Sequence, residues 1–174
     1  SLIQEIEEMD HIIGDFVSFV RTGTVEEFET IELVSLIKES IQNFNQSGSD
    51  LLFKLPDSPI KVQLNPISIK RVLNNLLENA FKYGKPPVEI TLLQLQDKTY
   101  LSIRDHGDGL DQDQLASIFS PFVMAGTKNN QYGSGLGLAI VEKLLEQNNT
   151  SIRVENHQDG GLQFTIVFLN PAAK

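Results

Sequence analysis

The sequence predicts an α+β fold: a two-layer sandwich in which helices cover one face of a mixed, mostly antiparallel sheet, preceded by an N-terminal helix. Three observations predict it. Apolar residues recur at helical spacing in some segments and alternate in others. Strand-like runs and helical segments are separated by long connections. The 174 residues, of which 40% are hydrophobic, are enough to bury the core of one such domain.

Composition excludes several classes of function. The net charge of -9 argues against nucleic acid as a partner, because few cations are available to neutralise phosphates. The sequence contains no cysteine, so it has neither disulfides nor thiolate metal sites. No apolar run approaches the ~20 residues of a membrane span, and no signal peptide opens the chain. Because the chain begins in mid-helix, we expect a fragment whose membrane segments, if any, were left out.

Residues 1–22 are predicted to form a helix with a narrow apolar seam. Its apolar residues are spaced by four and three in turn, as in a coiled coil, and acidic residues occupy much of the remaining surface. Such a seam needs a partner, either another helix bundle or the helix's own domain. Residues 23–30 are predicted to be a linker, and residues 31–174 the main domain. The seam consists of Leu2, Ile6, Met9, Ile13, Phe16 and Val20.

The next segments alternate between strands and a helix. A short strand at 28–30 precedes a helix from about Glu32 to Phe44, for which Thr30 is a candidate N-cap. Two apolar-rich runs at 51–55 and 60–64 follow. Prolines separate them, which predicts two strands with a turn between them.

A longer helix is predicted between Asn65 and Gly84. Asn65 is a suitable N-cap, Pro66 suits the first helical position, and Gly84 is expected to end the helix as a left-handed residue. Apolar residues form one face, at Ile69, Val72, Leu73, Leu76, Leu77 and Ala80. A polar stripe lies beside it, at Asn75, Glu78, Asn79 and Lys82. Alone, this stripe predicts either a solvated surface or one wall of a cleft.

A pair of strands, 88–95 and 99–104, leads into the motif Asp105-His-Gly107-Asp-Gly109. Its glycines permit a tight turn and a close backbone approach, and the Asp105 carboxylate can accept a hydrogen bond from an exocyclic amine. Such a motif alone is more often an ordinary turn. His106 could be a titratable group or an incidental exposed histidine.

The last third of the chain contains a second glycine motif. Asp111 and Gln114 form a capping-box pattern for a short helix that reaches Phe119. The run beginning at Gly133 opens a helix to about Glu146, where free amides and the helix dipole favour an anion. It is neither a Walker A loop nor a Rossmann fingerprint. A hairpin of 151–155 and 162–169 is predicted to close the domain.

Four motifs in this order resemble the N, G1, F and G2 boxes of sensor histidine kinases, within the GHKL ATPase family that includes gyrase B, Hsp90 and MutL proteins. The motifs are Asn75 to Tyr83, Asp105 to Gly109, Phe119 to Phe122 and Gly133 to Leu138. Residues 16–23 resemble the same place in EnvZ-like osmosensor kinases. There they mark the end of the second dimerisation helix and a hinge at Gly23.

The resemblance implies an ATP and Mg²⁺ site. It makes Asn79 the Mg²⁺ ligand, Asp105 the acceptor for the adenine amino group, and Tyr83 a neighbour of the adenine ring. It assigns the phosphates to Asn75, Lys82 and the second glycine motif. The remaining implied ATP-binding residues are Gly107, Gly109, Phe119, Phe122, Gly133, Gly135, Leu136, Gly137 and Leu138. Residues between Phe122 and Gly133 are expected to form a lid.

The resemblance also bears on the reaction. Hydrolytic relatives carry a glutamate where this chain has Asn75, which favours phosphoryl transfer to a protein over hydrolysis. Glu78 is a candidate general base, or else a solvated or metal-orienting carboxylate. The lid lacks the arginine common in such kinases, and Lys128 is the candidate substitute. The G1 box has His106 and Asp108 where Asn and Pro are common.

The expected protein is the cytoplasmic portion of a bacterial inner-membrane sensor, a protein-histidine kinase. The phosphoacceptor motif is absent, so we expect transfer to a histidine on a dimerisation helix outside this chain, relay to a response regulator, and a homodimer in the full-length protein. One alternative is a degenerate nucleotide-binding regulatory module without kinase activity. An ATP-gated clamp is disfavoured by Asn75.

Overall fold

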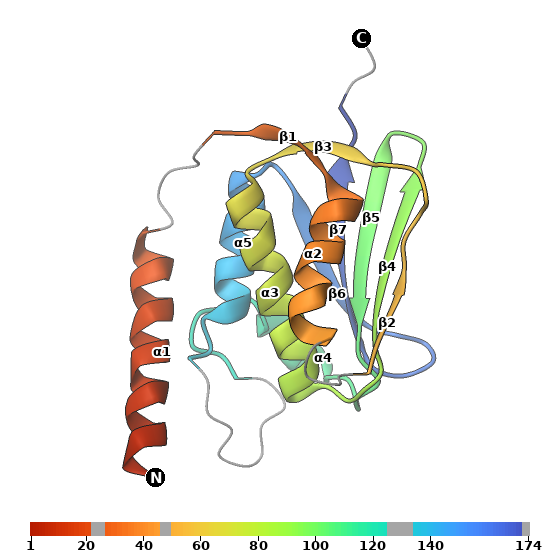
Figure 1. The fold of residues 1–174 in the computed structure, drawn as a ribbon. Helices are drawn as coiled ribbons and strands as arrows, with labels where there is room; N and C mark the ends of the chain where they lie inside the picture. Colours follow the sequence, from red (N-terminus) through yellow and green to blue (C-terminus); the bar gives the residue numbers. More distant parts are fainter. Residues whose placement is uncertain (22–26, 46–49, 125–133, 172–174) are drawn as a thin grey trace.

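The computed structural model describes residues 1–21, 27–45, 50–124 and 134–171. Its main sheet has the strand order β2-β4-β5-β7-β6, and α2, α3 and α5 cover one face (Figure 1). Only β2 and β4 are parallel, so the sheet is mixed and mostly antiparallel, as predicted. The elements are α1 (Leu2–Arg21), β1 (Glu29–Glu32), α2 (Leu33–Asn45), β2 (Leu51–Lys54), β3 (Lys61–Leu64), α3 (Pro66–Tyr83), β4 (Val88–Leu95), β5 (Lys98–Arg104), α4 (Gln112–Ser117), α5 (Gly137–Gln147), β6 (Ser151–Asn156) and β7 (Leu162–Leu169).

The core lies between the helices and the inward face of the sheet. Alternate residues of β5 are buried, including Leu101 and Ile103, and they face the fully buried apolar side of α3. The six predicted apolar positions of α3, from Ile69 to Ala80, are all buried. The adjacent polar stripe of α3 is therefore held at a fixed place relative to the sheet.

Strands β2 and β3 form as predicted, but they belong to different sheets. β2 pairs in parallel with β4, with Leu51 opposite Val88, whereas β3 pairs antiparallel with β1 in a separate two-stranded sheet. Two prolines lie between the strands, and proline cannot donate to a ladder. The chain therefore changes layer at this turn instead of folding back on itself.

The N-terminal cap of α2 is Glu32 and not Thr30. One Glu32 carboxylate oxygen accepts from the amides of Val34 and Ile60, both at 3.0 Å, and the other accepts from the Ser35 amide at 2.8 Å. Burial acts to raise the pKa of Glu32, but hydrogen bonds from Ser35, Ile60 and Val34 outweigh it and lower the pKa. Thr30 lies two residues before this cap position, and its hydroxyl accepts a hydrogen bond from Gln63 instead.

The predicted cap is confirmed at the N-terminal end of α3, whereas the predicted conformation at its C-terminal end is wrong. The Asn65 side chain accepts from the Ser68 amide at 2.9 Å, which confirms the N-cap. Gly84 does end the helix, but the prediction of a left-handed residue is wrong, since its φ is -89° and its ψ is -165°. A Cβ at Gly84 would lie 2.5 Å from Cβ and Cγ of Asp105. Glycine is needed here for a close approach.

The other local predictions hold. Asp111 and Gln114 form both bonds of a capping box at α4. β4 and β5 form an antiparallel pair, as do β6 and β7. The second glycine motif leads into α5 at Gly137.

Helix α1 stands at the edge of the domain, beside α5 (Figure 1). Lys143 of α5 donates to the Phe19 carbonyl at 3.3 Å, and its ammonium lies 4.9 Å from the centre of the Phe19 ring. No residue of α1 is buried, and its seam residues Leu2, Met9 and Val20 are each at least 60% exposed. Within the described ranges, no helix has the length and apolar character of a membrane span.

Candidate functional site

A cavity of about 260 Å³ opens between the C-terminal half of α3, the loop after β5 and the start of α5. It brings together motifs that are up to 63 residues apart in the sequence. Eleven of the predicted site residues line it: Asn75, Glu78, Asn79, Lys82, Tyr83, Asp105, Gly107, Gly109, Gly135, Gly137 and Leu138. Three of the four motifs therefore contribute residues to the site, whereas the third, Phe119 to Phe122, contributes none and only its neighbours Ile118 and Val123 line the cavity.

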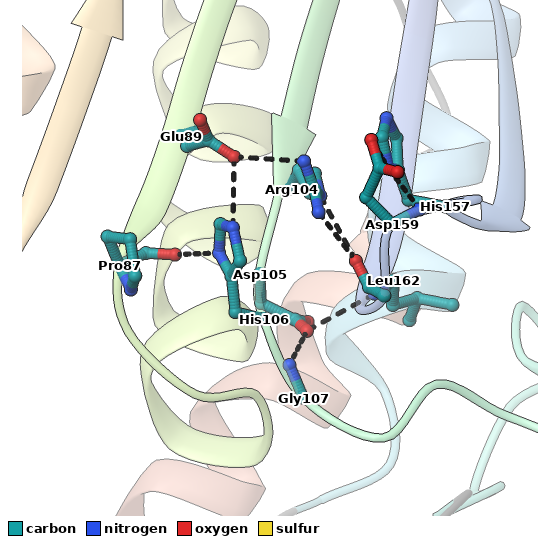
Figure 2. Close-up of polar contacts among 10 residues, drawn as sticks. Pro87, Glu89, Arg104, Asp105, His106, Gly107, His157, Asp159 and Leu162 are labelled. Atoms are coloured by element: carbon teal, nitrogen blue, oxygen red, sulfur yellow. Dashed lines mark hydrogen bonds and ion pairs between the residues drawn. The ribbon is translucent and has the colours of Figure 1, made fainter.

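Asp105 lies at one end of the cavity and is 7% exposed. Its Oδ1 accepts from the Gly107 amide at 2.8 Å and from the Leu162 amide at 3.2 Å (Figure 2). Its own amide donates to the Leu162 carbonyl at 3.0 Å. None of the described residues donates a hydrogen bond to Oδ2. A buried carboxylate with one oxygen held and the other open to a cavity is a fixed acceptor for an N–H donor.

Two glycines allow the backbone to close around Asp105. A Cβ at Gly84 would collide with the Asp105 side chain, as described above. A Cβ at Gly161, whose φ is +87°, would lie 1.8 Å from the Asp105 carbonyl oxygen. Neither position has room for a side chain, so the segment after α3 and the β6–β7 turn pack directly on the acceptor.

Asn156 fixes the far end of the same loop. Its Oδ1 accepts from the Leu110 amide at 2.9 Å and its Nδ2 donates to the Leu110 carbonyl at 2.7 Å. Gly109 has a φ of +73°, and a Cβ there would lie 2.5 Å from Asn156 Oδ1. The glycine therefore serves this close contact as well as the turn.

The polar stripe of α3 forms one wall. The Asn75 Nδ2 donates to the Gly137 carbonyl at 3.2 Å, which ties α3 to the first residue of α5. Glu78 is exposed and Asn79 half-buried, and both line the cavity. The Lys82 ammonium lies 5.4 Å from the centre of the Tyr83 ring. The wall thus offers amide and carboxylate oxygens together with one cation.

The start of α5 forms the opposite end. No side chain among the described residues caps the first turn of α5, so its first amides are available to a ligand where Gly137 and Leu138 line the cavity. Gly135 has a φ of +66°, and its carbonyl accepts from the Phe122 amide at 2.9 Å. This end of the cavity has the features of an anion site.

Some predicted site residues do not line the cavity. Leu136 is completely buried in the core. Phe119 packs edge-on against Phe164 at 6.1 Å, and Phe122 is 63% exposed. Lys128, Gly133 and most of the predicted lid, as well as the hinge at Gly23, lie outside the described residues.

Other residues at the cavity were not foreseen. Asp15 of α1 accepts a 2.7 Å hydrogen bond from Ser134, and His11 lies 3.8 Å from Asp15. Both α1 residues line the cavity. No local signal marks them, because the contact spans 119 residues. The sequence does mark Gly161 through the Gly-Gly pair of the final hairpin, but this pair predicted only a turn and not a contact with Asp105.

The donor set fits the nucleotide and metal that the resemblance implies. Mg²⁺ prefers oxygen ligands and takes only one or two from a protein when phosphates and waters supply the rest. The Asn79, Asn75 and Glu78 side chains offer such oxygens in the cavity that the start of α5 also lines. Asp105 offers an acceptor at the other end, so a ligand with an amine and several phosphates matches both.

Comparisons with known proteins agree with this chemistry. A model of the family described as histidine kinase-, DNA gyrase B-, and HSP90-like ATPase matches residues 64–172. The chain is 30% identical over 164 residues to the signal transduction histidine-protein kinase/phosphatase MprB of Mycolicibacterium vanbaalenii, covering 92% of this chain and 34% of MprB. It is 31% identical over 140 residues to the sensor histidine kinase component HK1 of Mycobacterium tuberculosis, covering 80% and 82%.

Solved structures show the same likeness. The histidine kinase domain of the E. coli osmosensor EnvZ superposes with a TM-score of 0.69 and 26% identity, covering 87% of this chain and 94% of that one. The chain spans about a third of the length of MprB, so the similarity concerns one part of a longer relative.

Proposed function

Because the chain belongs to the histidine kinase-, DNA gyrase B- and HSP90-like ATPase family, we propose that it is the ATP-binding catalytic domain of a two-component sensor histidine kinase. It transfers the γ-phosphate of Mg-ATP to a histidine on a dimerisation helix, for relay to a response regulator. One observation carries this proposal: Asp105 presents a single open oxygen to a cavity whose other end is the uncapped start of α5.

Different cavity residues bind the adenine, the phosphates and the Mg²⁺ of Mg-ATP. Asp105 accepts from the adenine amino group, and Tyr83 flanks the ring. The first amides of α5, with Gly135 and Gly137, bind phosphate oxygens. Asn79 holds Mg²⁺, which neutralises charge on the phosphates when bound. Lys82 adds a point charge near them.

Transfer to a protein is favoured over hydrolysis by the chemistry of Asn75. Its amide has no basic atom to activate water, and its Nδ2 is already engaged with the Gly137 carbonyl. Glu78, which lines the cavity, is the candidate base for an incoming histidine. Lys128 is the candidate for the missing lid arginine.

Helix α1 supports the wider part of the proposal. Its exposed apolar seam suits the end of a dimerisation helix of EnvZ-like type, so that residues 1–22 belong to the four-helix bundle of a homodimer and 23–30 link it to the catalytic domain at 31–174. In the full-length sensor we infer an inner-membrane location with this portion in the cytoplasm.

Calorimetric titration with a non-hydrolysable ATP analogue, with and without Mg²⁺, tests the site. We expect Mg²⁺-dependent binding that weakens at least tenfold in Asn79→Ala, because the metal loses its protein ligand. Asn43→Ala is the matched control, since Asn43 is exposed on α2 away from the cavity, and it should bind as the wild type does. Adding a phosphoacceptor helix and labelled ATP then tests transfer.

Two outcomes would count against the proposal. No binding under any condition would remove the catalytic role. Binding without any phosphoryl transfer to a phosphoacceptor helix would favour the regulatory module instead.

A further inference from the structure

Helix α1 carries two stripes of side chains that point in different directions. Its apolar seam is exposed, whereas a second stripe, with the same spacing of four, three and four, is half-buried. The members of this second stripe are Glu8, Ile12, Asp15 and Phe19. With about 100° between successive residues, it lies about a third of a turn from the seam. The helix therefore leaves its seam open and turns a different side towards the domain.

Two members of the half-buried stripe contact the domain at separate points. Asp15 Oδ2 accepts from Ser134 Oγ at 2.7 Å, just before α5. One turn later on α1, the Phe19 carbonyl accepts from Lys143 at 3.3 Å, and the Lys143 ammonium lies over the Phe19 ring (Figure 1). Asp15 and Ser134 line the cavity, whereas Phe19 and Lys143 do not. The first contact therefore belongs to the site, and the second only holds the helix beside it.

The Asp15 contact reaches the start of α5. Ser134 Oγ, which donates to Asp15, also accepts from the Leu136 amide at 3.2 Å. Leu136 is the residue immediately before the first turn of α5. Negative charge is favourable beside the N-terminus of a helix, because the helix dipole is positive there. In this structure the Asp15 carboxylate supplies a negative charge at that end, two hydrogen bonds away from the Leu136 amide.

Asp15 and a nucleotide phosphate would therefore carry like charges at the same end of the cavity. The Asp15 side chain is only 23% exposed, so water screens its charge less than that of a surface carboxylate. Bound phosphates then make the contact between Asp15 and Ser134 less favourable. By linkage, the docked helix lowers the affinity for nucleotide by the same factor.

We propose that α1 is an internal competitor of the nucleotide: Asp15, docked on Ser134, occupies the phosphate end of the cavity, so that nucleotide binding and α1 docking oppose each other. The inference rests on the proposed function. Lys143 and Phe19 act in this competition only by holding the helix near the site.

The first test is the dissociation constant of ADP with Mg²⁺, measured by calorimetry at constant pH and ionic strength. We expect Asp15→Ala to bind ADP about fivefold more tightly than the wild type, because it removes both the docking bond and the like charge. Asp15→Asn keeps an oxygen that can accept from Ser134, so its affinity should lie between the two. Asp10→Ala, which removes an exposed carboxylate of α1 outside the cavity, should bind as the wild type does.

Lys143→Ala separates docking from charge. It removes the second contact of α1, so we expect ADP to bind about twofold more tightly. The loss of a cation by itself would weaken the binding of an anion, so the two effects have opposite signs. Weaker binding in this variant would contradict the proposal. Thermal unfolding of each variant shows that it is folded.

The second test measures docking directly. Because the chain contains no cysteine, spin labels can be attached to cysteines introduced at the exposed residues Glu5 of α1 and Glu155 of β6. We expect a narrow distribution of distances between the labels without nucleotide, and a broader, displaced one with saturating ADP and Mg²⁺. Asp15→Ala in the labelled chain should broaden the distribution before any nucleotide is added.

The outcomes distinguish the two proposals. An ADP affinity of Asp15→Ala that equals or falls below that of the wild type overturns the competition and leaves the nucleotide site standing. A distance distribution that saturating ADP does not change has the same consequence. If neither the wild type nor Asp15→Ala binds ADP, both proposals fail.

Discussion

The two ends of α3 are built by different kinds of contact. At the Asn65 end, the cap is local: its side chain accepts from Ser68, three residues away. Its amide also donates to Asn148 Oδ1 at 2.8 Å, at the end of α5. At the Gly84 end, the helix stops against Asp105, which is 21 residues further along the chain.

Because of this difference, we expect substitutions at the two ends to affect different properties of the chain. The Asn65 end joins α3 to the core and lies away from the cavity, whereas Gly84 and Asp105 both line it. We therefore expect changes at the first end to lower the free energy of unfolding alone. Changes at the second end should also weaken nucleotide binding.

Gly84→Ala should give the largest effect. The new Cβ would meet Asp105 at 2.5 Å and the Ala80 carbonyl oxygen at 2.6 Å, so either the backbone or the acceptor must move. We expect a loss of about 2 kcal/mol in the free energy of unfolding, measured by urea titration, and at least tenfold weaker ADP binding by calorimetry.

Gly14→Ala is the matched control for this substitution. Apart from its chain neighbours and the backbone of α1 itself, no described atom lies within 4 Å of a Cβ at Gly14, so alanine there should not destabilise the chain. If Gly84→Ala binds ADP like the wild type, Asp105 tolerates displacement and the close approach has no role in the site.

Asn65→Ala should have a smaller effect, confined to stability. Removing the acceptor for Ser68 should lower the free energy of unfolding by about 1 to 2 kcal/mol in urea titration. Nucleotide affinity should stay within about twofold of the wild type. Asn65→Asp keeps the accepting oxygen and should retain most of the stability, and a tenfold loss of affinity in Asn65→Ala would erase the distinction between the two ends.

Glu32→Gln tests a second helix cap, whose side chain accepts from both local and distant amides. The pKa of Glu32 is lowered in the folded chain, so its carboxylate stabilises the fold above the ordinary range of glutamate and this contribution is lost as the pH falls through the lowered value. We expect Glu32→Gln to cost about 1 kcal/mol at pH 7 and nearly nothing once the pH lies below the lowered pKa of Glu32.

Unfolding curves at several pH values measure this difference. Glu29→Gln is a suitable comparison, because Glu29 is exposed on the same short strand. A difference between wild type and Glu32→Gln that grows as the pH falls would contradict the assignment of Glu32 as the cap.

The sequence predicted those features of the fold that depend on neighbours in the chain. The Asn65 cap, the capping box of Asp111 and the apolar face of α3 each follow from a pattern within a few residues. It mispredicted features decided by distant contacts. Glu32 became a cap because the Ile60 amide approaches it, and Gly84 ends α3 in an extended conformation because Asp105 is there.

The candidate site shows the same division. The motifs containing Asn79, Asp105 and Gly137 could be identified because each keeps its residues together, and the cavity does gather them. Leu136 lies inside a motif yet points into the core, since the helix that begins beside it must bury one face. The parts played by Gly161 and Asn156 depend on a hairpin that returns to the loop only after folding.

The bonds to Asp105 Oδ1 have an energetic consequence. Because the Gly107 and Leu162 amides already fix the carboxylate, the chain has little rotational freedom left to lose at this residue when a ligand amine arrives. An acceptor that is set before binding favours rapid capture with a small local ordering penalty. This end of the cavity would then act as a rigid reference point, against which the rest of a bound nucleotide is aligned.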